Sequence, residues 1–162
     1  MLVLNGETFN LGDYDAASAE MQRFLSACSS SADPTIAGKT VSQWERDWTN
    51  RRPLTDNFSD LRESVGVYRA WFEGSIVYIG RATEWSNGGF RKRLRDYTRQ
   101  GDGNRQSPAG QLMYLNREVI TINVLVTGRD RDAAFAAHHL ETILIAKYNP
   151  PWNIHGIDAE GR

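Results

Sequence analysis

The sequence predicts an α/β protein of the α+β type, in which helices flank a small three-stranded antiparallel sheet and an N-terminal extension precedes it. Between residues 65 and 127, three segments rich in β-branched and aromatic residues indicate strands. Helical spacing of apolar residues follows the second and third of these segments. The expected order of the main domain is strand, strand, helix, short helix, strand, helix.

The bulk composition is that of a soluble globular protein. Of the 162 residues, 40% are hydrophobic and 24% are charged, and this length suits one domain with an appendage. The sequence has no run of 18 apolar residues and no basic, apolar leader, so we expect no membrane span and no secretion signal. A single cysteine, Cys28, allows no internal disulfide, and we expect a cytoplasmic protein.

The net charge of −1 conceals a division along the chain. Residues 1–65 carry six Lys and Arg against ten Asp and Glu, whereas residues 66–155 carry twelve against eight. Phosphate binding needs a local basic patch rather than a basic whole, so this division permits nucleic-acid binding by the second part.

Residues 1–60 are expected to form the extension, residues 61–157 the main domain and residues 158–162 a tail. In the extension, two apolar runs surround the hairpin turn signal Asn5-Gly6. Helical spacing follows over residues 14–28 and again over residues 41–50.

The second of these helices presents Trp44 and Trp48, which are four residues apart. Aromatics at this spacing dock a helix more often than they stack on bases. We therefore expect the extension to pack on the main domain through these two side chains.

The main domain is predicted in six elements separated by turn signals. Strands are expected over residues 65–71, 75–80 and 118–127, and helices over residues 88–99, 111–115 and 132–148. Pro150-Pro151 ends the last helix, and the polar loop at residues 100–108 is a candidate recognition or dimer element.

The first two strands bring two tyrosines together. If Phe72-Glu73-Gly74 is a three-residue loop, Tyr68 lies directly opposite Tyr78 and both phenols stand on one face of the sheet. A two-residue loop would place them on opposite faces. Strand tyrosines that merely fill a half-buried surface are the alternative interpretation.

Two charged residues lie close to the apolar faces of their predicted helices. Arg93 lies beside the apolar stripe of the basic helix, where a guanidinium is costly without an anionic partner. Glu141 is surrounded by apolar residues on the last helix, with His138 one turn earlier. The two could form an ion pair with each other; alternatively, Arg93 could meet a phosphate and Glu141 could hold Mg²⁺.

These residues together resemble the GIY-YIG nuclease family. The resemblance covers about residues 64–155 in five elements, and the motifs are Gly66-Val67-Tyr68, Tyr78-Ile79-Gly80, the following Arg81, the helix residues 90–97, and residues 140–153. Arg93 stands at the invariant arginine of the family, Tyr97 at a frequent aromatic, Glu141 at the metal ligand and Asn153 at the asparagine after the proline turn. Val67 replaces the usual isoleucine, and residues 82–89 form a longer loop than in the shortest members.

The resemblance implies a mechanism. One Mg²⁺ or Mn²⁺ on Glu141 binds the scissile phosphate and stabilises the leaving oxygen, while Arg93 offsets the charge that develops on the phosphoryl group. Tyr68 orients or deprotonates the attacking water, and Arg81 helps to favour its phenolate form.

Other residues are expected to support this site. Tyr78 shares the hydrogen-bond network, Asn153 braces the site or a metal-bound water, and His138 is a candidate for the second coordination shell. Candidate nucleic-acid contacts are Arg91, Lys92, Arg95, Tyr97, Arg99, Trp85 and Asn87.

The expected function is therefore that of a metal-dependent endonuclease that hydrolyses phosphodiester bonds, with DNA as the favoured substrate. The size suits a stand-alone restriction-like, phage-related or single-strand-specific nuclease. A catalytically silent nucleic-acid-binding domain, or a nuclease that a protein partner recruits through residues 1–60, is the alternative. A homodimer formed through that extension is also consistent with the sequence.

Overall fold

The computed structural model describes residues 2–4, 7–9, 33–99 and 107–153. The chain separates into two compact units, Met1–Trp48 and Thr49–Arg162. This division comes before the predicted boundary at residue 60, because the strand β5 (Arg52–Pro53) belongs to the sheet of the second unit. The predictions for residues 5–6, 14–28, 100–106 and 158–162 lie outside the described residues.

The first unit holds a small sheet with the strand order β2-β1-β3-β4. Its strands are β1 (Leu2–Leu4), β2 (Glu7–Phe9), β3 (Thr35–Ile36) and β4 (Lys39–Thr40). The strands β1 and β2 pair antiparallel with Leu4 opposite Glu7, which confirms that the two predicted apolar runs lie side by side.

The helix predicted over residues 41–50 is shorter in the structure. The helix α2 (Val41–Trp44) begins with a capping box at Thr40 and continues only as the 3-10 helix η1 (Glu45–Asp47). The chain then becomes extended at Trp48. Trp44 is buried and its indole N–H donates to the Ile36 carbonyl within the same unit, so docking through the tryptophans stays a prediction.

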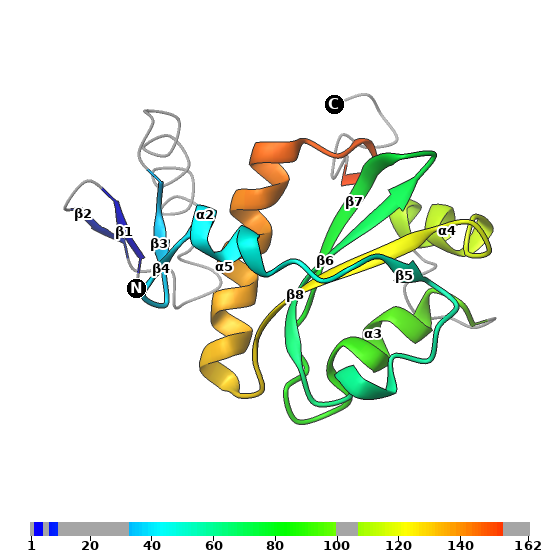
Figure 1. The fold of residues 1–162 in the computed structure, drawn as a ribbon, viewed down its shortest axis with the longest axis horizontal. Coiled ribbons are helices and arrows are strands. Elements are labelled where there is room, and N and C mark those ends of the chain that lie inside the picture. The colour runs from blue at the N-terminus through cyan, green and yellow to red at the C-terminus, as the bar shows by residue number, and fades with distance from the viewer. Residues whose placement is uncertain (1, 5–6, 10–32, 100–106, 154–162) are drawn as a thin grey trace. The chain divides into compact units, whose positions relative to one another are not determined.

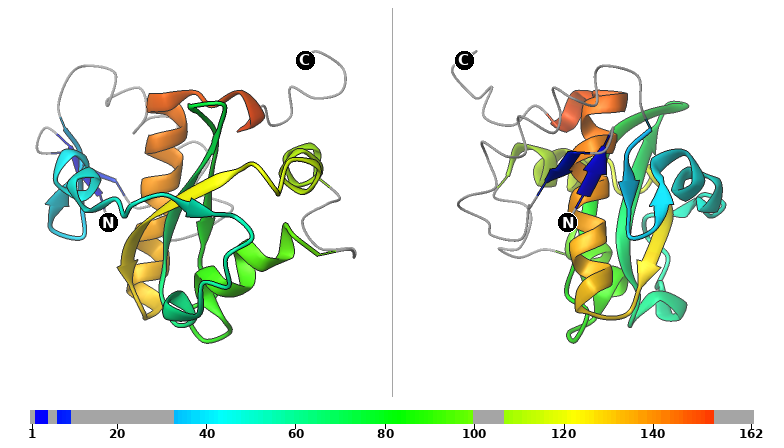
Figure 2. Two further views of the ribbon diagram at one scale, coloured as in Figure 1. Left: turned by 45° about the vertical axis from the view of Figure 1, so that its right-hand side comes forward. Right: turned by 90° about the vertical axis from the view of Figure 1, so that its left-hand side faces the viewer.

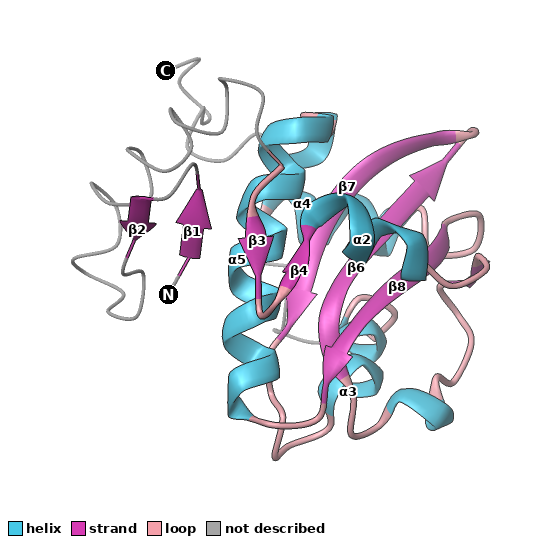
Figure 3. Cartoon of the chain, turned by 60° about the vertical axis from the view of Figure 1, so that its left-hand side comes forward, coloured by secondary structure: helices cyan, strands magenta, loops and turns pink. Residues whose placement is uncertain are grey.

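The second unit follows the predicted order of elements. Its sheet elements and helices are β5, η2 (Ser59–Leu61), β6 (Val65–Phe72), β7 (Ser75–Ala82), α3 (Gly89–Asp96), α4 (Pro108–Leu115), β8 (Thr121–Gly128), α5 (Arg131–Tyr148) and η4 (Pro151–Asn153). The sheet has four strands instead of the expected three, in the order β5-β8-β6-β7. Figure 3 shows β8, β6 and β7 side by side. The short strand β5 has no alternating pattern to predict it, and its proline is tolerated because β5 lies at an edge.

Helices cover both faces of this sheet, as Figures 1 and 2 show. The helix α5 packs along β6, β7 and β8, where Val67, Ile79 and Leu125 are fully buried. The helix α3 packs on the other face, in a core cluster that contains Phe90 and Leu94. Because both faces are covered, β6 is buried along most of its length instead of alternating between polar and apolar residues.

The β6–β7 hairpin differs from its prediction. Its turn consists of two residues, Glu73 and Gly74, both with positive φ, because Phe72 pairs with Ser75. The predicted pairing of Tyr68 with Tyr78 is wrong, since Tyr68 lies opposite Gly80. A two-residue turn with regular pairing would place the two tyrosines on opposite faces of the sheet. A register shift beside Ala70 adds one residue on β7, so both tyrosines still share one face.

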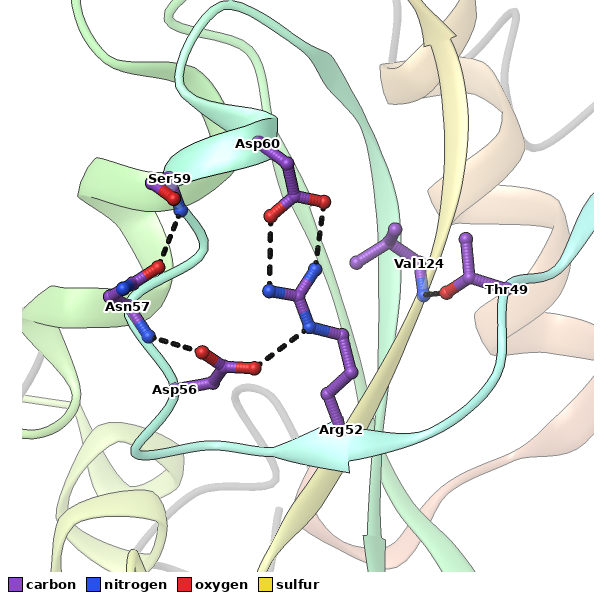
Figure 4. Close-up of polar contacts among 7 residues, drawn as sticks. All are labelled: Thr49, Arg52, Asp56, Asn57, Ser59, Asp60 and Val124. Atoms are coloured by element: carbon purple, nitrogen blue, oxygen red, sulfur yellow. Dashed lines mark hydrogen bonds and ion pairs between the residues drawn. The ribbon is translucent and has the colours of Figure 1, made fainter.

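The chain that leads into β6 is held in place by a charged cluster of Arg52, Asp56 and Asp60 (Figure 4). The Arg52 guanidinium donates to Asp60 through both terminal nitrogens, at 2.9 and 3.0 Å, and to Asp56 through Nε at 3.0 Å. It also stacks over the buried Phe58 ring at 4.6 Å. These contacts hold the segment that joins β5 to η2, and η2 in turn packs against α3.

Candidate active site

A polar pocket of about 220 Å³ opens at the edge strand β7. Six elements or their caps contribute to it: β6, β7, α3, α4, α5 and η4. Its described lining residues are Tyr68, Tyr78, Arg81, Arg93, Tyr97, Ser107, Glu141, Ile145 and Asn153. The structure thus brings together all six residues that were predicted to be catalytic.

Tyr68 reaches the pocket across Gly80. The Tyr68 side chain is only 1% exposed, and its ring occupies the space beside its cross-strand neighbour. A Cβ added to Gly80 would lie 2.9 Å from Tyr68 Cε2 and would also overlap the phenol oxygen. The glycine of the second tripeptide motif therefore provides the opening through which the phenol of the first motif reaches the site.

Three phenols form one wall of the pocket. The Tyr68 and Tyr97 hydroxyl oxygens are 2.5 Å apart, and the ring of Tyr78 lies 6.2 Å from that of Tyr68 and 6.5 Å from that of Tyr97. Burial raises the pKa of all three phenols above their usual value. The wall is therefore neutral at neutral pH, and the charge of the pocket comes from its guanidinium and carboxylate groups.

Arg93 supplies a positive charge from α3. It lies half-buried in the last turn of the helix. Burial acts to lower the pKa of Arg93, but the phenols of Tyr68 and Tyr97 raise it above its usual value. Arg93 also lowers the pKa of Tyr68 in return, against the larger effect of burial. The positive charge of Arg93 therefore favours ionisation of Tyr68, and an ionised Tyr68 favours the charged form of Arg93.

Glu141 forms an ion pair with Arg81. Arg81 Nη1 on β7 donates to Glu141 Oε1 on α5, and the two side chains are 29% and 13% exposed. The structure therefore shows a protein cation at Glu141, as one of the two interpretations of its apolar surroundings predicted, and Arg81 contributes it. The described lining carries two guanidinium groups against one carboxylate, and this balance favours an anion.

Asn153 is held against the edge of the sheet. Its Oδ1 accepts from Ile79 N and its Nδ2 donates to Ile79 O, both at 2.8 Å. The amide thereby supplies the hydrogen bonds that a neighbouring strand would make to β7. The amide therefore fixes Asn153 to β7, and its role in bracing the site or a metal-bound water stays a prediction.

The predicted nucleic-acid contacts lie around α3 in varied positions. Arg95, Arg99, Trp85 and Asn87 are exposed, while Arg91 and Lys92 are half-buried. Lys92 lies 3.9 Å from Glu84. Tyr97 is buried in the pocket wall, and its contact with nucleic acid stays a prediction.

His138 lies half-buried on α5, one turn before Glu141. Burial lowers the pKa of His138, and the charge of Arg81 acts in the same direction. It is not among the described residues that line the pocket, so its place in a second coordination shell stays a prediction.

Two lining residues were missed by reasoning from sequence. Ser107 caps the N-terminus of α4 by accepting from Gly110 N at 3.0 Å, and Pro108 follows it. This Ser-Pro pair is a helix-start signal that could have extended the predicted helix to the pocket. Ile145 lies one turn after Glu141 and could have been found from that spacing.

The chemistry of the pocket fits one hard divalent cation. Within the described residues, no group of three or more His, Cys, Asp and Glu side chains is arranged so that it could hold a metal ion. Glu141 is nonetheless a largely buried oxygen donor that already attracts a cationic group, in a lining of hydroxyl, amide and guanidinium groups. One carboxylate with several waters is an accepted way for a protein to hold Mg²⁺.

The fold and the pocket define a class of protein: an α+β domain with a pocket at the edge of its sheet whose described lining carries more guanidinium than carboxylate groups. Residues 64–154, more than half of the chain, match the family described as the UvrC-like GIY-YIG domain. The chain therefore belongs to the GIY-YIG nuclease family. Comparison with curated proteins and with solved structures gave no match. Among the described residues, no helix is long and apolar enough to cross a membrane.

Proposed function

We propose that this protein is a metal-dependent endonuclease that hydrolyses phosphodiester bonds in DNA. The observation that carries the proposal is the convergence of Tyr68, Tyr78, Arg93 and Glu141 on one pocket. These residues come from two strands and two helices and span 74 positions of the sequence, and they are those that the family resemblance singles out. A binding domain without catalysis would need the basic surface of α3 but not a carboxylate in the same pocket as three phenols.

In the proposed site, Arg93 binds the scissile phosphate and offsets its negative charge as the new bond forms. Its guanidinium suits this role because it can donate two parallel hydrogen bonds to phosphate oxygens. Glu141 holds the divalent cation, and the cation, when bound, supplies Lewis-acid charge to the phosphoryl group and the leaving 3′-oxygen.

Tyr68 orients the attacking water, and in its phenolate form it accepts the proton of that water. The raised pKa of Tyr68, caused by burial, is an obstacle, since a neutral phenol is a poor base. The hydrogen bond with Tyr97 and the charge of Arg93 both act in favour of the phenolate. Tyr97 is therefore a positioning residue for Tyr68, and Tyr78 completes the wall of phenols.

The exposed cations beside the pocket extend the binding surface to neighbouring phosphates. Arg95 and Arg99 are exposed at the end of α3 and beyond it. Such contacts position a nucleic-acid backbone without reading its sequence. The proposed enzyme is a restriction-like, phage-related or single-strand-specific nuclease.

The test is cleavage of end-labelled single-stranded and duplex DNA and RNA, with Mg²⁺, with Mn²⁺ and with a chelator. We expect cleavage of DNA that requires the cation and is abolished by Glu141→Gln and by Arg93→Ala in folded protein. Binding of all four substrates without cleavage would instead establish a catalytically silent domain. Metal-dependent cleavage of RNA alone would retain the chemistry and change the substrate.

A further inference from the structure

The ion pair between Arg81 and Glu141 places a protein cation on the carboxylate that the proposed function assigns to a metal. Arg81 Nη1 donates to Glu141 Oε1, and both side chains line the pocket. Glu141 is the one carboxylate among the nine described lining residues. A divalent cation at this pocket and the Arg81 guanidinium therefore compete for the same carboxylate.

The two cations cannot share the carboxylate without cost. A guanidinium and a divalent ion on the same group repel each other, and the repulsion is strong where water is largely excluded. Glu141 is 13% exposed, so it lies in such a place, whereas Arg81 is 29% exposed on a long side chain. Arg81 is therefore the partner that can move.

An alternative anion for Arg81 is available in the same pocket. A phosphate bound by Arg93 would lie among the lining residues, within a pocket of about 220 Å³ that Arg81 also lines. The guanidinium can exchange a carboxylate for a phosphate with little loss, since it forms paired hydrogen bonds to either group.

We infer that Arg81 exchanges Glu141 for a substrate phosphate, so that the divalent cation and the nucleic acid bind cooperatively. The inference rests on the proposed function and adds a regulation of its site. Without nucleic acid, Arg81 weakens metal binding; without metal, Glu141 holds Arg81 back from the phosphate. Such coupling is reciprocal, so each ligand raises the affinity for the other by the same factor.

The first measurement is Mn²⁺ affinity of the full chain without nucleic acid, by electron paramagnetic resonance of free Mn²⁺. Arg81→Met should bind Mn²⁺ about tenfold more tightly than the wild type, within the usual range of such couplings. Arg81→Lys, which keeps the charge, should stay close to the wild type. Arg129→Met removes an equal charge from an exposed position after β8, outside the pocket, and should change the affinity less than about twofold.

The second measurement adds phosphorothioate-linked DNA, single-stranded and duplex, which slows cleavage. In the wild type, DNA should raise Mn²⁺ affinity by about fivefold or more, and Mn²⁺ should raise DNA affinity by the same factor. In Arg81→Met both effects should disappear. If Arg81→Met does not fold, Arg81→Gln provides the same comparison.

The outcomes separate the inference from the proposed function. If Glu141→Gln loses Mn²⁺ binding but Arg81→Met binds it no more tightly than the wild type, the exchange is wrong and the metal site stands. If Glu141→Gln binds Mn²⁺ as tightly as the wild type, the assignment of the metal to Glu141 fails first.

Discussion

Tyr68 lies opposite Gly80 in the β6–β7 ladder, and its ring occupies the space that a side chain at position 80 would need. This relationship joins the two tripeptide motifs of the family physically. It explains why the second motif ends in glycine although the φ of Gly80 is not among the positive values of the chain. The glycine is required for space rather than for backbone conformation.

Gly80→Ala should therefore destabilise the protein and displace the Tyr68 phenol. We expect the free energy of unfolding, measured with urea, to fall by about 2 kcal/mol, as for overpacked cores, and cleavage to be strongly reduced. Gly74→Ala is the matched control: its added Cβ meets nothing within 4 Å, so only the strain of its positive φ remains. Equal loss of activity in the two variants would contradict the proposed passage of Tyr68 across Gly80.

Asn153→Asp should loosen the edge strand. The aspartate can still accept from Ile79 N but cannot donate to Ile79 O, so a carboxylate oxygen would face a buried carbonyl. We expect a loss of about 2 kcal/mol in unfolding free energy and faster amide hydrogen exchange along β7. The exposed Asn87→Asp should cost less than about 0.5 kcal/mol. An unchanged exchange rate at Ile79 would argue against the brace.

The three pocket phenols should make the fold sensitive to alkali. Burial raises the pKa of Tyr68, Tyr78 and Tyr97 in the folded state, whereas in the unfolded chain a tyrosine has a pKa of about 10. The stability that comes from keeping them neutral is complete below that pH and is lost as the pH rises above it.

In a titration followed by near-ultraviolet absorbance and circular dichroism, ionisation of these phenols should coincide with loss of the fold. Tyr97→Phe should remove part of this late absorbance change and leave a buried Tyr68 hydroxyl without its 2.5 Å partner. Full phenolate absorbance in a protein that is still folded would show that the wall is open to solvent.

Arg93→Lys should separate charge from geometry at the phosphate. Lysine keeps the positive charge but cannot donate two parallel hydrogen bonds. We expect kcat to fall by about 100-fold, as when one donor of a preorganised anion site is removed. Arg99→Lys, at an exposed position, should keep kcat and change only binding at low salt. Equal kcat for Arg93→Lys and the wild type would exclude a bidentate role.

Much of the fold could be predicted from local pattern. The apolar periodicity of α5, the capping Asp130 before it and Pro150 after it define that helix almost to the residue. The strands β6 and β7 were likewise recognised from composition and spacing. All these signals depend only on residues that are close together in the sequence. The strand β5 was missed because two residues carry no period.

The residues of the site were also found from sequence, but their contacts were not. A costly charge on an apolar helix face indicated that Glu141 needs a cationic partner, but not that the partner is Arg81. The register of the hairpin was mispredicted because the turn has two residues rather than three and a bulge beside Ala70 then shifts the pairing. Tyr97 was expected on the apolar stripe of its helix, but its contact with the Tyr68 hydroxyl could not be read from that spacing.

By itself, the sequence determined the class of fold, the order of the main-domain elements and the chemical types that the site contains. Periodicity and turn chemistry act over a few residues, so they can be recognised from the sequence alone. Tertiary structure decided which groups meet: the phenol of Tyr68 with that of Tyr97, and the guanidinium of Arg81 with Glu141. Such pairings depend on the register of strands and the placement of helices, which the whole core selects at once.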